Sequence, residues 1–186
     1  MADLRKLPWN RFPKWPRLED RVSENFWFGE LIRSDLADRL SIRNSIRSVK
    51  HVRAAVYLCR NVLQPMRDEF GAFSPNSVYR CQALERALKK KPASWSSSSQ
   101  HTTGEACDVT IPGVATLALA QWVEKNLEFD QLICECYDPA KGPSSGWVHV
   151  SLRPPGSRRN RRQLLSYIFD HDHRRYVYVD GLQAMA

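Results

Sequence analysis

The stretch that decides the fold is Ser99-Gln-His101-Thr-Thr-Gly104-Glu-Ala106-Cys-Asp108-Val-Thr-Ile111. It places a histidine and an aspartate seven positions apart, with a glycine between them and a β-branched run after them. The glycine and the β-branched run predict a turn that enters a strand, in place of a continuous helix. Such a turn folds the chain back, so that an imidazole from the loop and a carboxylate from the strand converge.

A second segment, Trp147-Val-His149-Val-Ser151, offers another imidazole at a loop–strand junction. With His101 and Asp108 it completes a set of two histidines and one carboxylate. Three protein ligands and an open fourth position are typical of a catalytic zinc site, in which a bound water of pKa about 7 supplies the nucleophile. Taken alone, the three residues are explained more simply as a hydrogen-bonded polar cluster.

The segments around these two predict an α+β fold, with N-terminal helices packed on a small, mostly antiparallel sheet. Apolar residues recur at helical spacing from Val49 to Phe70, between a capping Ser48 and a terminating Gly71, and Pro65 predicts a kink or break in this helix. Shorter helices are expected within 29–40 (capped by Ser34), at 82–88 and at 114–127. Strands are expected at 77–79, 106–111, 129–135 and 147–151, with a hairpin of 164–169 and 176–179.

Length and composition indicate one ordinary globular domain. The chain has 186 residues, of which 42% are hydrophobic, and the apolar run 114–123 is too short for a membrane span. Residues 1–25, punctuated by prolines and aromatic residues, predict an arm laid over a single domain at 26–186, which ends in a basic hairpin. The five cysteines predict reduced thiols, and core packing is a simpler role for Cys134 and Cys136 than soft-metal binding. No signal peptide is recognisable, which predicts synthesis in the cytoplasm.

The charge balance is basic, with 28 Lys+Arg against 20 Asp+Glu and a net charge of +8. A positive net charge is compatible with an anionic partner but does not identify its chemical class. The cluster Arg158-Arg159-Asn-Arg161-Arg162 lacks a recognition helix or stacking aromatics, so nucleic-acid binding is not expected and a solvated connector is the simpler interpretation. His171 and His173 flank Asp172 at the predicted hairpin tip and are expected to be turn residues, with a metal site as the alternative.

The double motif Ser99-x-His101-x-x-Gly104-x-Ala106-x-Asp108 and Trp147-Val-His149 resembles the zinc D-alanyl-D-alanine peptidase family, which has the Hedgehog/DD-peptidase fold. That family includes D-Ala-D-Ala carboxypeptidases and the L-alanyl-D-glutamate endopeptidases that serve as phage endolysins. The resemblance extends over segments 26–35, 61–67, 79–80, 129–135 and 161–182, the last being similar to the tail of phage-encoded members.

The resemblance implies that His101, Asp108 and His149 bind zinc. It also implies that Arg80 holds an anionic part of the substrate, for which a guanidinium is well suited, while a structural salt bridge is the alternative. Ser99 is expected to hydrogen-bond within the ligand loop, in contact with substrate, and not to act as a nucleophile, because no base is spaced to activate it.

The general base is where this sequence departs from the family pattern. Many relatives carry an acidic residue three positions before the second histidine ligand, and this chain has Gly146 there. Glu135, at the end of the preceding strand, is the best remaining carboxylate, with a surface role as its alternative, and Glu105 is a weaker candidate.

The resemblance therefore predicts a zinc metallopeptidase that hydrolyses the peptide stems of peptidoglycan, phage- or prophage-encoded, acting on the cell wall after release or as a virion component. The basic residues near 153–162 would then favour encounter with an anionic wall. The alternative is a non-catalytic zinc-binding structural or cell-wall-binding module, which the glycine at position 146 supports.

Overall fold

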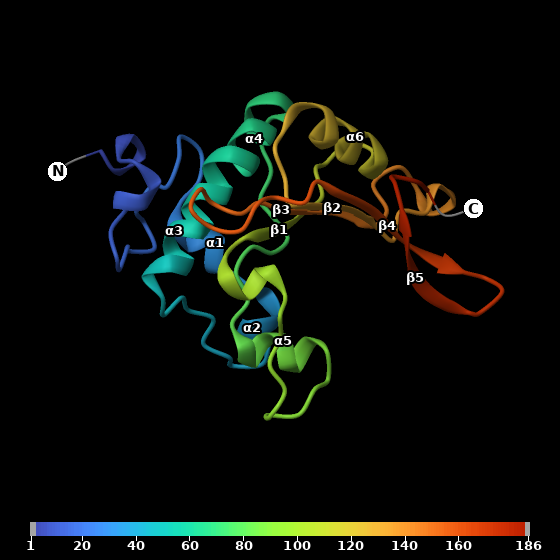
Figure 1. The fold of residues 1–186 in the computed structure, drawn as a ribbon, viewed down its shortest axis with the longest axis horizontal. Helices are drawn as coiled ribbons and strands as arrows, with labels where there is room; N and C mark the ends of the chain where they lie inside the picture. The colour runs from blue at the N-terminus through green and yellow to red at the C-terminus, as the bar shows by residue number, and fades with distance from the viewer. Residues whose placement is uncertain (1–2, 185–186) are drawn as a thin grey trace.

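The computed structural model describes residues 3–184. Residues 1–2 of the predicted N-terminal arm and residues 185–186 of the predicted domain lie outside the described part. The structure confirms an α+β fold (Figure 1). The helices are α1 (Phe28–Ile32), α2 (Asp35–Arg39), α3 (Val49–Leu58), α4 (Gln64–Phe70), α5 (Gln82–Leu88) and α6 (Thr116–Asn126). The strands are β1 (Ala106–Val109), β2 (Gln131–Glu135), β3 (Trp147–Ser151), β4 (Gln163–Asp170) and β5 (Arg175–Asp180).

The five strands form one mixed sheet in the order β1-β3-β2-β4-β5. Three of the pairings are antiparallel, as expected, and β2 with β4 is parallel. The predicted strand at 77–79 is wrong, because this segment makes only one isolated bridge, from Ser77 to Asp108. The next amides form hydrogen bonds with other segments: that of Tyr79 donates to the carbonyl oxygen of Leu31, and that of Arg80, just after the segment, to the carbonyl oxygen of His101.

Alternation along the strands gives the sheet two different faces. On β3, Val148 and Val150 belong to the hydrophobic core, and the registered partners of Val150, Cys107 and Leu132, lie in the same core. The opposite face carries His149 of β3 with its partners Asp108 of β1 and Ile133 of β2. The sheet therefore separates an apolar core from a polar face on which the predicted ligands gather.

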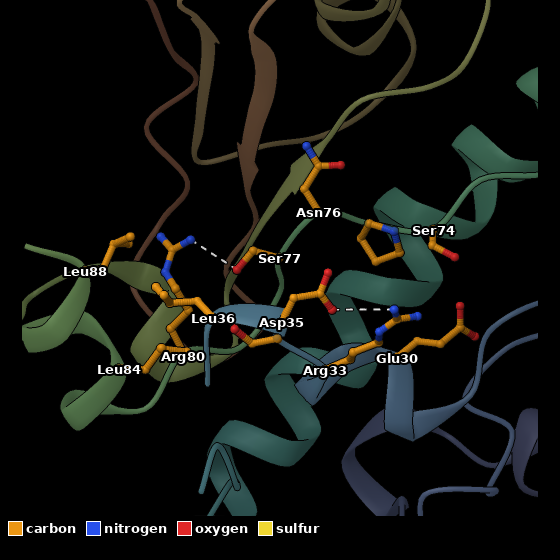
Figure 2. A pocket seen from close by; sticks show the side chains of 12 residues that line it. Glu30, Arg33, Asp35, Leu36, Ser74, Asn76, Ser77, Arg80, Leu84 and Leu88 are labelled. Carbon is orange, nitrogen blue, oxygen red and sulfur yellow. Dashed lines mark hydrogen bonds and ion pairs between the residues drawn. The ribbon is translucent and has the colours of Figure 1, made fainter. Parts of the chain in front are cut away.

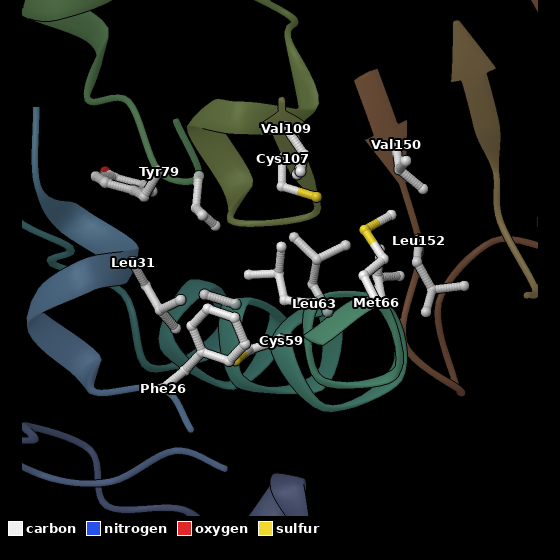
Figure 3. Close-up of a cluster of buried hydrophobic side chains, with 14 of the residues drawn as sticks. Phe26, Leu31, Cys59, Leu63, Met66, Tyr79, Cys107, Val109, Val150 and Leu152 are labelled. Carbon is white, nitrogen blue, oxygen red and sulfur yellow. The ribbon is translucent and has the colours of Figure 1, made fainter. Parts of the chain in front are cut away.

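The core fills the space between the sheet and the long helical segment of residues 49–70 (Figure 3). Leu63 and Met66 from that segment are fully buried, as are Val150 and Cys107 of the sheet. Burial of such side chains is the main source of stability in a domain of this size. All five cysteines are free thiols, as predicted.

The expected break at Pro65 takes the form of a π-helical segment, Cys59–Leu63, that joins α3 to α4 without ending the helix. Proline lacks an amide hydrogen, and its ring crowds the carbonyl four residues earlier. A wider turn before the proline relieves this crowding. Gly71 ends the helix with φ +80°, as the sequence indicated.

The N-terminal segment packs on this helix as two short 3-10 turns, Leu4–Lys6 and Trp9–Arg11. Phe12 is fully buried in the core, and Arg60 donates to the backbone carbonyls of Leu4, Leu7 and Val22. Within residues 3–184, no helix is long and apolar enough to cross a membrane.

Candidate metal centre and active site

The first ligand loop is one 3-10 turn, Gln100–Thr103, which Gly104 ends in the left-handed region with φ +75°. A Cβ on Gly104 would lie 2.7 Å from the carbonyl oxygen of His51 on α3, so glycine is required by both conformation and space. The chain then enters β1. This is the turn-to-strand geometry that the sequence predicted, and it places His101 above the strand that carries Asp108.

His101, Asp108 and His149 converge on one point of the polar sheet face. His101 Nε2 lies 3.2 Å from Asp108 Oδ1 and 3.2 Å from His149 Nδ1, and His149 Nδ1 lies 2.9 Å from Asp108 Oδ1. The three residues are buried, with exposed fractions of 1%, 9% and 8%. Among residues 3–184 they form the single group of three or more His, Cys, Asp and Glu side chains with the spacing of a metal site.

These distances fit a zinc ion. A tetrahedral ion with bond lengths of about 2.0–2.1 Å would place its ligand atoms roughly 3.3–3.4 Å apart, close to the observed spacing. The donor set agrees, because the facing nitrogens of His101 and His149 are both lone-pair donors in the metal-binding form. Without a cation or a bridging proton, two such lone pairs would repel each other at this distance.

The surroundings hold the ligands in their metal-binding forms. His101 Nδ1 donates to the carbonyl oxygen of Val78 over 2.7 Å, which leaves Nε2 free of hydrogen and facing the other ligands. Burial lowers the pKa of His101, which keeps the ring neutral near pH 7. Burial alone would raise the pKa of Asp108, but the adjacent imidazoles of His101 and His149 hold it well below its usual value. A neutral imidazole and an ionised carboxylate are the forms that bind metal.

Behind Asp108 lies a buried charge network. Arg80 Nη1 donates to Asp108 Oδ2 over 2.8 Å, and Arg80 Nε donates to Glu85 Oε1 over 2.5 Å. The Glu85 side chain is fully buried and also accepts from Ser97 Oγ and Lys89 Nζ, each at 2.9 Å. Two of the guanidinium nitrogens are thereby engaged by protein carboxylates. Arg80 orients the second oxygen of Asp108, which leaves Oδ1 turned toward the two histidines.

Sequence reasoning missed Glu85. It follows Arg80 by five positions on α5, where it resembles an ordinary charged helix residue. Its carboxylate is surrounded by Arg80, by Lys89 and by Ser97 of the loop that follows α5. The helical period of apolar residues along α5 does not distinguish Glu85 from its charged neighbour Arg86, which is only partly buried.

Glu135 lies beside the three ligands. On β2 it pairs with Trp147, while Ile133, two residues earlier, pairs with His149, so all four side chains share the polar face. Burial raises the pKa of Glu135 to about 7, and the carboxylate of Asp108 adds to the effect. A carboxyl group whose pKa lies near neutral pH is suited to proton transfer in both directions.

The structure explains the glycine at position 146. Gly146 has φ +70°, and a Cβ there would lie 2.1 Å from the carbonyl oxygen of Glu135 and 2.6 Å from the carbonyl carbon of Cys136. No side chain fits at this point of the β2–β3 turn. An acidic residue is therefore sterically excluded here, and Glu135, on the neighbouring strand, is the carboxylate that lies beside the three candidate ligands.

The ligands and Glu135 line a cavity of about 530 Å³. Ser99, half-buried, also lines it; its carbonyl oxygen accepts from the amide and hydroxyl of Thr102, which stabilises the ligand loop. Basic side chains surround the cavity, and Tyr178 reaches it from β5. Its cationic lining consists of Arg80, Lys89, Arg153 and Arg161. Glu105 lies elsewhere, in a hollow beside Lys50 and His51, and accepts from Thr103.

A second hollow, of about 370 Å³, adjoins the first and lies between α1, α2 and α5 (Figure 2). Arg80 and Leu88 line both hollows. In Figure 2 the Arg80 guanidinium is directed toward Ser77, to which it donates over 3.1 Å. Arg80 thus lies in the wall between the two hollows, where its Nε and Nη1 donate to Glu85, Asp108 and Ser77.

Among the remaining predicted residues, the two histidines of the hairpin lie away from the cavity. His171 and His173 are exposed at the tip of the β4–β5 hairpin, and His173 Nδ1 lies 2.8 Å from Asp170 Oδ2, which is the geometry of a turn. In the basic cluster, Arg161 is bound to the buried Asp130 and Arg162 contacts Glu128. Part of the cluster is therefore engaged in ion pairs within the fold.

The sequence model of the Peptidase M15 family matches residues 25–151, which include all three ligands, Arg80 and Glu135. The chain belongs to this family. The M15 family consists of zinc-dependent metallopeptidases, in agreement with the ligand geometry described above. Searches of the curated proteins and of the solved structures found no significant match.

Proposed function

We propose that this M15 peptidase hydrolyses the peptide stems of bacterial peptidoglycan. The observation that carries the proposal is the convergence of His101, Asp108 and His149 beside a carboxyl group, Glu135, whose pKa is raised to about 7. The double histidine motif resembles the D-alanyl-D-alanine peptidases, which supports this substrate class. The similarity of segment 161–182 to phage-encoded members supports a phage or prophage origin.

The cationic lining of the cavity suits such a substrate. Peptidoglycan stems carry free carboxylates, and Lys89, Arg153 and Arg161 line the space beside the ligands. Arg161 is already bound to Asp130, and Arg153 Nε lies 3.1 Å from the same carboxylate, so both side chains are held in place near the cavity. Positive side chains fixed in advance bind an anionic peptide at a low entropic cost.

In the proposed reaction, Glu135 accepts a proton from the attacking water and then donates it to the amine of the leaving group. Zinc, when bound by His101, Asp108 and His149, would polarise the scissile carbonyl and activate the water. Arg80 acts as a positioning residue, because its guanidinium fixes the free oxygen of Asp108 and is in turn held by Glu85.

The test measures bound zinc and the cleavage of purified muropeptides by the wild type, His101→Ala and Glu135→Gln. We expect His101→Ala to lose zinc and activity together. Glu135→Gln should retain zinc and lose about 10²–10⁴-fold in kcat, the usual contribution of a general base. Glu128→Gln is the matched control, since its carboxylate is 75% exposed and lies outside the cavity.

Two results would contradict the proposal in different ways. Stoichiometric zinc without cleavage of any cell-wall fragment would favour the non-catalytic module. Full activity of Glu135→Gln would leave the peptidase intact and remove Glu135 as the base. Mass spectrometry of the products identifies the bond that is cut, which separates carboxypeptidase from endopeptidase activity.

A further inference from the structure

The β4–β5 hairpin begins beyond residue 151, where the family match ends, and it extends the sheet past β2 (Figure 1). Its strands pair from Leu165 with Asp180 to Asp170 with Arg175. Glu135 of β2 is in register with Tyr167 of β4, and Tyr167 with Tyr178 of β5. Because registered partners point to the same side of a sheet, this face of the hairpin continues the face that carries the metal ligands.

Three tyrosines cluster on that face; we call Tyr167, Tyr176 and Tyr178 the tyrosine platform. The ring centroids of Tyr167 and Tyr178 lie 4.5 Å apart at 34°, and those of Tyr167 and Tyr176 lie 5.2 Å apart in a stacked arrangement at 27°. Tyr178 is 58% exposed and Tyr176 41%. Large aromatic side chains are rarely left this exposed as a group unless the surface contacts something.

The platform is continuous with the candidate active site. Tyr178 lines the same cavity as Asp108, His149 and Glu135. Tyr167 on β4 is the registered partner of Glu135, and Tyr176 and Tyr178 lie on β5, the outermost strand, so the platform runs from Glu135 toward the end of the sheet. A substrate that enters the cavity therefore passes over aromatic rings on this side.

The two parts of this surface have different chemistry. The cavity offers cationic groups, Lys89, Arg153 and Arg161, which suit a peptide with free carboxylates. The platform offers apolar ring faces edged by phenol hydroxyls. A pyranose has the matching division, with an apolar face of C–H groups and a rim of hydroxyls, and it makes dispersion contacts with an aromatic face.

The geometry points to the tyrosine platform as a saccharide subsite that holds an N-acetylated amino-sugar ring of the glycan strand while the attached stem peptide occupies the cavity. This inference rests on the proposed function for the identity of the peptide. In peptidoglycan the stem is covalently joined to the sugar, so a surface next to the peptide cavity is where the sugar would lie.

The direct test uses a probe without any peptide, the β-1,4-linked tetramer of N-acetylglucosamine. Its dissociation constant is measured by NMR titration against the full chain, with and without zinc. We expect binding that does not depend on zinc, with nuclear Overhauser contacts between sugar C–H protons and tyrosine rings. Tyr176→Ala and Tyr178→Ala should each weaken binding up to about tenfold, the upper worth of one aromatic contact.

Tyr178→Phe and Trp15→Ala are the matched variants. Tyr178→Phe retains the ring and should keep most of the affinity. Trp15 is 65% exposed on the N-terminal arm, so its removal deletes an exposed aromatic ring elsewhere and should not change the dissociation constant. The inference is overturned if the wild type does not bind the tetramer, or if Tyr176→Ala and Tyr178→Ala bind it as tightly as Trp15→Ala.

A second measurement separates this inference from the proposed function. The ratio of kcat/KM for a glycan-linked stem peptide over that for the free stem peptide should fall in Tyr176→Ala. Failure of the proposed function appears as no cleavage of either peptide while the tetramer still binds. Failure of the saccharide subsite appears as cleavage of both peptides, an unchanged ratio and no tetramer binding.

Discussion

Replacing Gly146 with alanine should destabilise the protein by about 2–5 kcal/mol. A residue with a Cβ at φ +70° pays about 1–2 kcal/mol for the left-handed conformation. The Cβ would also lie 2.1 Å from the carbonyl oxygen of Glu135, and forcing an extra carbon into packed space costs about a further 1–3 kcal/mol. Relief of this overlap has to move the end of β2, and with it the carboxyl group of Glu135.

Gly156→Ala is the matched control, because Gly156 has φ +83° and nothing within 4 Å of the position a Cβ would take. Gly156→Ala should lower the free energy of unfolding only by the cost of the left-handed backbone conformation, about 1–2 kcal/mol. Urea unfolding, followed by the fluorescence of the six tryptophans, gives both values. Equal losses of unfolding free energy in the two variants would refute the steric argument. Full peptidase activity in a folded Gly146→Glu variant would refute the exclusion of an acid at this position.

Three further predictions follow from the site and its supports. Zinc at a hundredfold excess over its dissociation constant should stabilise the wild type by about 2.7 kcal/mol in urea unfolding and should not stabilise His101→Ala; equal stabilisation of both would contradict the ligand assignment. Glu85→Gln should weaken zinc binding about 10–100-fold in a chelator competition, because Arg80 loses one of the two carboxylates that hold it beside Asp108; unchanged affinity in a folded variant would remove Glu85 from the support of the site. Asp130→Asn should cost about 1–3 kcal/mol at pH 7, since it leaves the mostly buried Arg153 and the half-exposed Arg161 without the carboxylate that they share. Burial would raise the pKa of Asp130, but Arg161 holds this pKa below the usual value. The contribution of the Asp130 carboxylate to the free energy of unfolding is therefore present above about pH 4 and declines as the pH falls through the lowered pKa. If Asp130→Asn lost the same free energy of unfolding at pH 7 and at pH 3, this linkage would be contradicted.

Much of the secondary structure follows from local patterns. Helix α5 has the predicted bounds, and the helices on either side of Ser34 and the stop at Gly71 agree with the capping residues seen in the sequence. Strands β2 and β3 lie within the ranges expected from the sequence, 129–135 and 147–151, and their antiparallel pairing agrees with the expected mostly antiparallel sheet. The segment 77–79 was assigned to a strand because Val78 and Tyr79 favour extended structure, but its amides bond to a helix and a loop, and no neighbouring strand extends the bridge.

The candidate site, like the secondary structure, could be predicted from the sequence only in part. The spacing of His101, Gly104 and Asp108, with His149 on a later strand, identified the ligand set, because a glycine-terminated turn before a strand constrains where those side chains point. The position of Glu135 on the same face follows from strand alternation once the register is known. The register brings position 146 so close to the backbone of Glu135, eleven positions earlier, that only glycine fits there.

The sequence by itself predicted the candidate ligands, the family and most of the elements, since these depend on short motifs and local patterns that can be read without the fold. Tertiary structure alone decided the ion pairs of Arg80, the burial of Glu85 and the steric exclusion of a side chain at position 146. It also brought the tyrosine platform to the edge of the cavity. These features depend on contacts between elements far apart in sequence, and on which face of a helix or strand is covered, which no local periodicity specifies.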